Sequence, residues 1–496
     1  MSSYKTILKT TGLFASLRIL SILVNIATSK LIAIFVGVSG IGLYGLYTSA
    51  LSLITTVADL GVSKSSVRNI AVADGTQEKE EIEKTISVVS KLIYVTGAIG
   101  ALITILLSFQ ISKWSFGDTS YWISFVFLGI CVFFTIVKNG QSAIFQGLRK
   151  YKLMTKSTIY SSLLSLIVSA PLIYFFKEDS IIYVILAGAV IAFVVTKLYL
   201  TQIEYTIAEK KTKLTRQNST DLIRLGLSMM LVSFLVALSG YIIRAYISNY
   251  GTVTDLGYFQ AGFQIISGYF GIIFTSMTTD YFPRISAIQD DNQKLTQEVN
   301  QQATITLLLI CPLVVILPFI MPYVIKILYS SEFSPTVEYV NIALFGIIFQ
   351  AGSQTMGMIL LAKNNAKVFT VSVFLFQSIF LILNILGFKY YGILGLGITF
   401  SINMLIHIIG VQSMNYILYK ISFNRHFFIT LITVLLFAIT ANYSSHLEGV
   451  FYYVVGGFLT LISFVFVLLR LKKLLKINSF MGLIKNKLNG KNKKNN

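Results

Sequence analysis

The sequence predicts an all-α polytopic membrane protein of about 14 transmembrane helices, built as two pseudo-symmetric six-helix lobes plus two C-terminal helices. Charged residues make up 12% of the 496 residues and hydrophobic residues 55%, whereas soluble domains carry about 25% charged residues. Mean hydropathy is +0.76. Apolar windows of roughly 20 residues, the length of a bilayer-spanning helix, recur with short polar gaps. The alternating segments of about 10 residues that are typical of a membrane β-barrel do not occur.

The helices follow one another as apolar runs separated by short polar gaps. The first run follows Lys5 and Lys9 and so resembles a signal peptide. It is too long, contains Lys30 and lacks a small-residue cleavage site, so we expect a retained first helix. The predicted spans lie near residues 9–36, 41–71, 86–109, 119–146, 153–176, 180–206, 222–249, 255–288, 300–329, 336–362, 366–388, 392–420, 427–445 and 449–471.

Basic residues set the predicted orientation and domain limits. Lys and Arg concentrate in the gaps near 149–156 and 210–216 and in the tail, which the positive-inside rule assigns to the cytoplasm together with both termini. The net charge of +20 is therefore mainly a topology signal. It is weak evidence for a nucleic-acid partner, although the tail could touch anionic membrane lipids. The predicted domains are an N-terminal lobe at 1–210, a C-terminal lobe at 211–421, two additional helices at 422–474 and a basic cytoplasmic tail at 475–496.

Four cations fall inside otherwise apolar spans: Arg18, Lys30, Lys138 and Arg244. A cation in hydrocarbon costs a few kcal/mol or more, so it normally faces a protein interior, a partner or a water-filled path. We therefore expect these four to bind an anionic substrate group, with Lys138 the least supported.

Further charged residues lie near the ends of spans. Lys64 and Arg68, one helical turn apart, either guard the mouth of a cavity or anchor the helix, and Arg284 is a third candidate for this mouth. The carboxylates Asp59 and Asp280 are candidates for coupling to an ion gradient, with pairing to nearby Lys64 and Arg284 as the alternative.

Uncharged polar side chains also recur in the spans, several of them four residues apart on one helix face. Singly, each pair is explained by hydrogen bonding between helices, worth about 0.6 kcal/mol. Together with the cations they suggest the lining of a wet cleft. The candidates are Asn25, Gln260, Gln264, Gln350 and Gln354.

A weak internal repeat supports two lobes. Shifting the chain by about 215 residues superimposes helix one on helix seven and aligns residues 42–44 (Gly-Leu-Tyr) with 257–259 (Gly-Tyr-Phe). Two pairs of cations match within one residue: Lys30 with Arg244, and Arg68 with Arg284. Parallel repeats of this kind are related by an axis along the membrane normal, with the substrate site between them.

The sequence carries no pattern for catalysis or cofactor binding. Cys131 and Cys311 are isolated in separate spans, and the three histidines lack ligand spacing. No phosphate-binding glycine loop is present, so we expect neither ATP hydrolysis nor a cofactor or metal. A membrane glycan polymerase or ligase would need a long loop with clustered catalytic residues, which is absent. We expect a transporter, not an enzyme.

Residues 37–44 (GVSGIGLY), 59–63 (DLGVS) and 280–286 (DYFPRIS) resemble segments of O-antigen translocases, the Wzx-type flippases of the MOP exporter superfamily. The resemblance covers essentially the whole chain. It implies translocation of undecaprenyl-diphosphate-linked oligosaccharide across a bacterial inner membrane, from the cytoplasmic to the periplasmic leaflet. It also implies two lobes that rock around a cationic cavity, ion-gradient coupling, and other polysaccharide-assembly membrane proteins as partners. The alternatives are a drug exporter of the same fold and, from another class, the polymerase or ligase.

Overall fold

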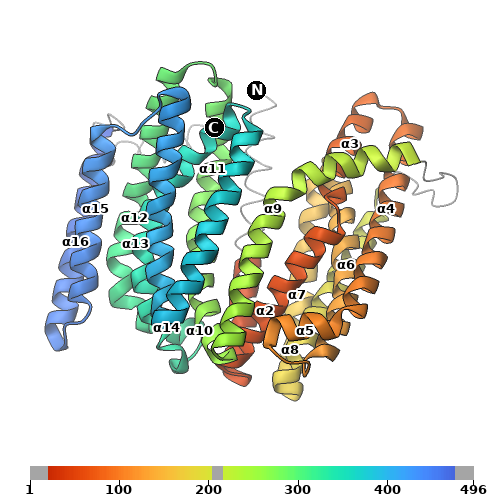
Figure 1. Cartoon of the computed structure of the whole chain (residues 1–496), viewed down its shortest axis with the longest axis horizontal. Helices are drawn as coiled ribbons and strands as arrows, with labels where there is room; N and C mark the ends of the chain where they lie inside the picture. The colour runs from red at the N-terminus through yellow and green to blue at the C-terminus, as the bar shows by residue number, and fades with distance from the viewer. Residues whose placement is uncertain (1–19, 204–215, 475–496) are drawn as a thin grey trace, which may run out of the picture. The chain divides into compact units, whose positions relative to one another are not determined.

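The computed structural model describes residues 20–203 and 216–474, and every regular element in these ranges is a helix (Figure 1). The all-α prediction is therefore confirmed. Ten helical stretches of the described chain are long and apolar enough to cross a membrane, and two of them, Tyr151–Leu200 and Ala366–Tyr419, each contain two predicted spans. The remaining predicted spans are the first, described from Leu20 to Phe35, and the eighth, which is interrupted. The protein is a multi-span membrane protein.

Large apolar side chains that a soluble protein would bury are exposed along these helices. Phe175 near the end of α7 and Val450 at the start of α16 are both 75% exposed. Exposure of this kind is expected where a helix contacts lipid, because burial from water is then provided by the bilayer itself.

The chain divides into two compact units, which we call unit 1 and unit 2. Unit 1 comprises the chain up to Ala261 with Lys326–Phe333 and Val373–Leu381, and unit 2 comprises Gly262–Ile325, Ser334–Ser372 and the chain from Ile382. The domain boundaries expected near residues 210, 421 and 474 stay predictions.

Unit 1 packs around α6, which contacts α3, α4 and α8. Val89, Val137 and Ile144 are fully buried in this core. Because the three come from α4 and α6, the apolar faces of these two helices form its centre. The helices after Leu20–Phe35 are α2 (Val38–Ala58), α3 (Val62–Thr76), α4 (Lys79–Leu106), α5 (Ser108–Phe116), α6 (Trp122–Gly147), α7 (Tyr151–Phe176), α8 (Ser180–Leu200), α9 (Arg216–Tyr250) and α10 (Val253–Phe263), with a 3₁₀ turn at Lys177–Asp179.

The single helix predicted at 41–71 is wrong, because α2 and α3 are separated by a break. Leu60 and Gly61 have φ of 50° and 71°, a left-handed backbone that ends a helix. A Cβ on Gly61 would lie 2.1 Å from the carbonyl oxygen of Gly226 on α9, so only glycine fits. Close packing against another helix therefore fixes the break. A second difference is α5, a short helix in what the sequence left as a gap.

Unit 2 is built mainly from the helices that follow α10, among which α11 packs on α13, α13 on α15, and α15 on α16. Their bounds are α11 (Phe270–Ala287), α12 (Asn292–Leu328), α13 (Thr336–Ala362), α14 (Ala366–Tyr419), α15 (Arg425–Ser444) and α16 (Gly449–Leu474). The 3₁₀ turn at Ser331–Phe333, which follows α12, belongs to unit 1.

Two irregularities bear on the predicted spans. The span expected at 255–288 is interrupted by a π-helical segment, Gln264–Tyr269, between α10 and α11. Such segments are rare and insert one extra residue into the helical repeat. α14 contains a non-helical residue, Gly392, with φ of 58°. This position separates the two spans predicted at 366–388 and 392–420, so their division is confirmed.

Candidate functional site

Arg244 is a buried cation in the spanning helix α9. Its side chain is only 7% exposed, its Nε donates to Gln260 Oε1 at 2.9 Å, and its Nη1 donates to the Gly240 carbonyl oxygen at 2.9 Å. The guanidinium also lies 5.6 Å from the ring centroid of Phe259, within cation–π range. The structure thus brings together two predicted site residues, Arg244 and Gln260, in direct hydrogen-bonding contact.

A close crossing of α2 and α10 positions Gln260. A Cβ on Gly42 would lie 2.3 Å from the Val253 carbonyl oxygen, and a Cβ on Gly257 would lie 2.1 Å from that of Val38. These glycines are the pair that the internal repeat aligns. One turn further along α2, a Cβ on Gly45 would lie 2.6 Å from the Gln260 amide.

The absence of a side chain at Gly45 therefore makes room for the amide that holds Arg244. Sequence reasoning missed Gly45 as a site residue. Its spacing from Gly42 and the alignment of Gly42 with Gly257 were the only available signals.

Lys30 is half-buried near the end of the first described helix. Its Nζ donates to the carbonyl oxygen of Lys326 at 3.0 Å and to that of Tyr329. The Lys326 carbonyl lies in the last turn of α12, where carbonyl groups have no partner within the helix, and Tyr329 directly follows that helix. Lys30 therefore caps α12, and its positive charge is favourable at the negative end of the helix dipole.

The break between α2 and α3 holds a second group of predicted residues. The Asp59 carboxylate accepts a hydrogen bond from Ser63 Oγ at 2.7 Å and from the Ser63 amide at 3.2 Å. Lys64 Nζ donates to Ser233 Oγ on α9 at 2.6 Å. Arg68 lies one turn further along α3, exposed. Asp59 thus provides an acceptor for a backbone amide in the first turn of α3. This is a structural role, in addition to the coupling role that the sequence suggested.

The other unit 1 candidates contribute less to the hydrogen bonding described above. Lys138, in the middle of α6, is half-buried and makes no hydrogen bond or ion pair within residues 20–203 and 216–474. Asn25 is exposed on the first described helix. Arg18 lies outside the described residues.

Arg284, in unit 2, is surrounded by acceptors. Its Nε lies 3.0 Å from an Asp280 carboxylate oxygen and its Nη1 lies 2.8 Å from Glu298 Oε2. Nη2 donates to Gln302 Oε1 at 2.9 Å. Asp280 is thus paired with Arg284, the alternative that the sequence left open. One positive and two negative charges meet here, so this group does not present surplus positive charge.

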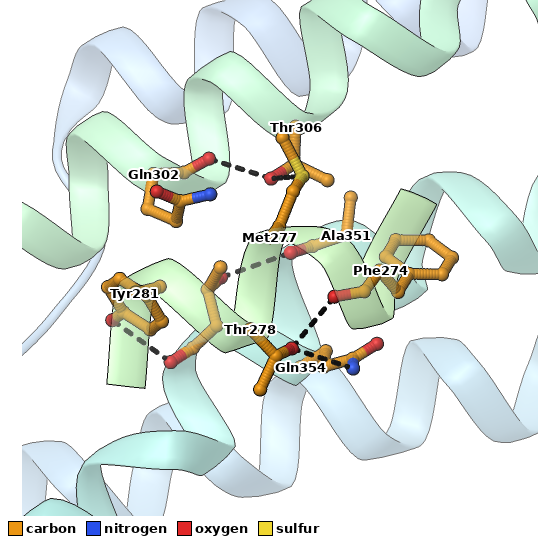
Figure 2. A pocket seen from close by; sticks show the side chains of 9 residues that line it. Phe274, Met277, Thr278, Tyr281, Gln302, Thr306, Ala351 and Gln354 are labelled. Carbon is orange, nitrogen blue, oxygen red and sulfur yellow. Dashed lines mark hydrogen bonds between the residues drawn. The ribbon is translucent and has the colours of Figure 1, made fainter. Parts of the chain in front are cut away.

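Gln354 faces a small cavity inside unit 2, between α11, α12 and α13 (Figure 2). Its Nε2 donates to Thr278 Oγ1 at 3.3 Å, and Tyr281 donates from the same cavity to the Thr355 carbonyl at 3.2 Å. The cavity volume of about 10 Å³ accommodates one water molecule, which is far too little for a sugar. Gln264 begins the π-helical segment and Gln350 is half-buried on α13, so neither lines this cavity.

Comparison with known proteins identifies the family of the chain. A family model described as "Polysaccharide biosynthesis protein" matches residues 31–338. Comparison with curated proteins gave no match.

Solved structures share the fold at low identity. The lipid II flippase MurJ in an inward closed conformation matches with a TM-score of 0.71 and 15% identity, over 94% of this chain and 99% of that one. An inward-facing multidrug resistance MATE family transporter of the MOP superfamily matches with a TM-score of 0.69 and 14% identity, over 82% of this chain and 99% of that one. The Vibrio cholerae MATE transporter VcmN in the bent form gives 0.57 and 14%, over 88% and 100%. The chain has the fold of MOP superfamily transporters, and because the family model covers more than half of it, it belongs to the polysaccharide biosynthesis protein family.

Proposed function

We propose that this protein is a flippase that moves undecaprenyl-diphosphate-linked oligosaccharide from the cytoplasmic to the periplasmic leaflet of a bacterial inner membrane. The observation that carries the proposal is the burial of a cation, Arg244, in a spanning helix, where a glutamine and a backbone carbonyl orient its guanidinium. A buried charge in a membrane helix is retained for function by default. Membership of a polysaccharide biosynthesis family suggests that its ligand belongs to a glycan carrier.

The chemistry of the guanidinium favours a diphosphate as that ligand. Arginine presents several N–H donors in one plane and binds phosphate oxygens bidentately, whereas lysine acts as a point charge. Gln260 accepts from Nε and the Gly240 carbonyl accepts from Nη1, so the guanidinium is already held in one orientation. A diphosphate would add charge-assisted hydrogen bonds, which are roughly twice as strong as neutral ones.

Alternating access would let the Arg244 guanidinium bind the diphosphate on one side of the membrane and release it on the other. The diphosphate would meet Arg244 from the cytoplasmic side and leave it towards the periplasm, while the lipid tail stays in the bilayer. Lys30 and Lys138 would assist by keeping the path positive, and Asp59 would couple the cycle to an ion gradient. We expect the amides of Gln260 and neighbouring polar groups to contact the glycan.

A transport assay in vesicles tests the proposal. Purified full-length protein is reconstituted, and the movement of one oligosaccharide is compared when it is linked to a polyprenyl diphosphate and to a polyprenyl monophosphate. We expect the diphosphate carrier to be flipped and Arg244→Ala to abolish the movement. Lys152→Ala, which removes an exposed cation on α7, is the matched control and should retain activity.

Full activity of Arg244→Ala would contradict the proposal, as would equal movement of both carriers. The fold match to a multidrug transporter supplies a second candidate, export of small molecules. Cationic drugs would meet positive charge at Arg244, so we expect no efflux of a cationic dye from the same vesicles. Dye efflux without movement of either glycolipid would favour this second function.

A further inference from the structure

A cavity of about 320 Å³, lined mainly by residues with polar side chains, lies in unit 2, where the N-terminal part of α12 and the first turns of α15 meet the last turn of α16. Its volume is at the lower end of the range of about 300–1,000 Å³ that is typical of small-molecule sites. It is therefore large enough for a polar headgroup but not for an oligosaccharide. The lining residues are Gln297, Asn300, Gln301, Thr304, Asn424, His426, Thr430, Arg470, Lys473 and Leu474.

The floor of this cavity is fixed by internal hydrogen bonds. Asn300 is 4% exposed, its Nδ2 donates to the Ser422 carbonyl at 3.0 Å, and its Oδ1 accepts from the Asn424 amide at 2.7 Å. Thr430 is 1% exposed and donates to the His426 carbonyl at 2.9 Å. Since these groups are already satisfied, a ligand would be held by the walls above them.

The walls are positively charged. Arg470 and Lys473, one helical turn apart at the end of α16, both line the cavity, and among the described residues no carboxylate does. Within the described part of the chain neither forms an ion pair. The Arg470 guanidinium rests 5.7 Å from the ring centroid of Phe466, which orients it without cancelling its charge.

The start of α15 adds to this positive field. Asn424 Oδ1 accepts the Phe427 amide at 2.9 Å and so caps the helix. The amides of Arg425 and His426 belong to the first turn, whose N–H groups have no acceptor within a helix. The positive end of the helix dipole thus lies at a cavity that two cations already line.

We propose that this cavity binds the phosphodiester headgroup of an anionic phospholipid. Its position favours a lipid over a free anion, because it lies at the ends of two spanning helices, α15 and α16. Leu474 forms part of its rim and is 42% exposed, and Leu469 on the same helix is 63% exposed, so an acyl chain would find apolar surface beside the headgroup. The sequence after Leu474 carries six lysines and no acid, which would add attraction to an anionic leaflet.

The test is lipid binding to the full-length protein in detergent. Short-chain phosphatidylglycerol is titrated against the wild type, with short-chain phosphatidylcholine and inorganic phosphate as comparison probes. We expect saturable binding of phosphatidylglycerol alone. Lys473→Gln should weaken it about fivefold and Arg470→Gln with Lys473→Gln on the order of 20-fold, since the loss of one ion pair with the bound headgroup costs about this factor.

Matched controls separate the cavity from general surface charge. Lys472→Gln removes the neighbouring lysine, which does not line the cavity, and should leave the affinity within about twofold. Gln301→Glu places a negative charge on an exposed wall residue and should weaken binding, whereas Gln293→Glu, on the same helix but outside the cavity, should not.

Three results would overturn the proposal: equal binding of both phospholipids, equal weakening by Lys472→Gln and Lys473→Gln, or saturation by inorganic phosphate that prevents phosphatidylglycerol binding. The thermal unfolding midpoint of each variant is measured alongside, and Gln301→Glu provides an answer if Arg470→Gln does not fold. Because the lipid arm contains no glycan, its outcome is independent of the transport assay.

Discussion

The cations of unit 1 and unit 2 differ in the charge of the atoms to which they donate hydrogen bonds. The unit 1 cations are Lys30 and Arg244, and the unit 2 cation is Arg284. Lys30 and Arg244 donate to neutral oxygen atoms, those of backbone carbonyls and of Gln260. Arg284 meets two carboxylates, Asp280 and Glu298. Neutral acceptors orient a cation without cancelling its charge, whereas two acids reverse the local charge. Under the proposed function, the unit 1 cations would bind an anion, whereas Arg284 links α11 to α12 through Glu298 and Gln302.

Replacing each arginine in turn by glutamine is the strongest test of the difference between the two units. Arg244→Gln should lower glycolipid transport at least about 30-fold, because truncating a buried hydrogen-bonded charge costs several kcal/mol. Arg284→Gln should lower it less than about fivefold, since the side chain is 45% exposed and exposed ion pairs contribute little. Initial rates in vesicles at equal protein content provide the measurement. Equal losses in the two variants would show that the two arginines do the same work.

Asp59→Asn should produce the next largest effect. Asparagine keeps an oxygen that can accept from Ser63 but carries no charge, so the turn between α2 and α3 should persist while coupling is lost. We expect gradient-driven transport to fall about 5- to 150-fold, the range of typical coupling energies, with downhill movement retained. Transport is measured with imposed proton and sodium gradients. Ser63→Ala is the control, because it keeps the carboxylate, and an unchanged gradient response in Asp59→Asn would exclude the coupling role.

Lys30→Met should have a moderate effect with a structural component. Removing the ammonium leaves the Lys326 and Tyr329 carbonyls without this donor and should destabilise the protein by about 1 kcal/mol, as for a cation at a helix C-terminus. Transport should fall about fivefold, and Lys30→Arg should restore both properties. Thermal unfolding and vesicle transport are measured together. A transport loss as large as that of Arg244→Gln, with unchanged stability, would instead make Lys30 a direct ligand of the cargo.

The double variant Asp280→Asn with Glu298→Gln should show the smallest effect. It removes the acids beside Arg284, and the Asp280 side chain is 78% exposed, so the loss of stability should stay below about 1 kcal/mol. Transport should be unchanged within about twofold. This variant also sharpens the comparison, because it leaves Arg284 with neutral acceptors like those of Arg244. A marked gain or loss of transport would show that charge cancellation in unit 2 matters for the cycle.

Hydropathy alone predicted the helical class and most helix positions, because apolar length is a local property of the chain. It missed the break at Leu60–Gly61, which depends on Gly226, a residue far away in sequence. It also missed the π-helical segment at Gln264–Tyr269, which has no signature in apolar periodicity. The first error arises because close packing against α9 fixes a break that local sequence does not mark.

The candidate site was predictable in its residue types and less so in its groupings. Arg244 and Gln260 were selected separately and lie in hydrogen-bonding contact. Periodicity could not reveal that Gln354 faces a cavity the size of a water molecule, or that Lys30 reaches carbonyl groups of α12. Those facts depend on which helices pack together, and sequence spacing carries no information about that.

The contact between Lys30 and the end of α12 can form only late in the synthesis of the chain. The ribosome must add 296 residues after Lys30 before the Lys326 carbonyl exists. At about 5–20 residues per second, this corresponds to roughly 15–60 s of synthesis. During that interval the ammonium must be sheltered by water, lipid phosphates or the insertion machinery. The first described helix therefore gains this hydrogen bond only when about two thirds of the chain has been translated.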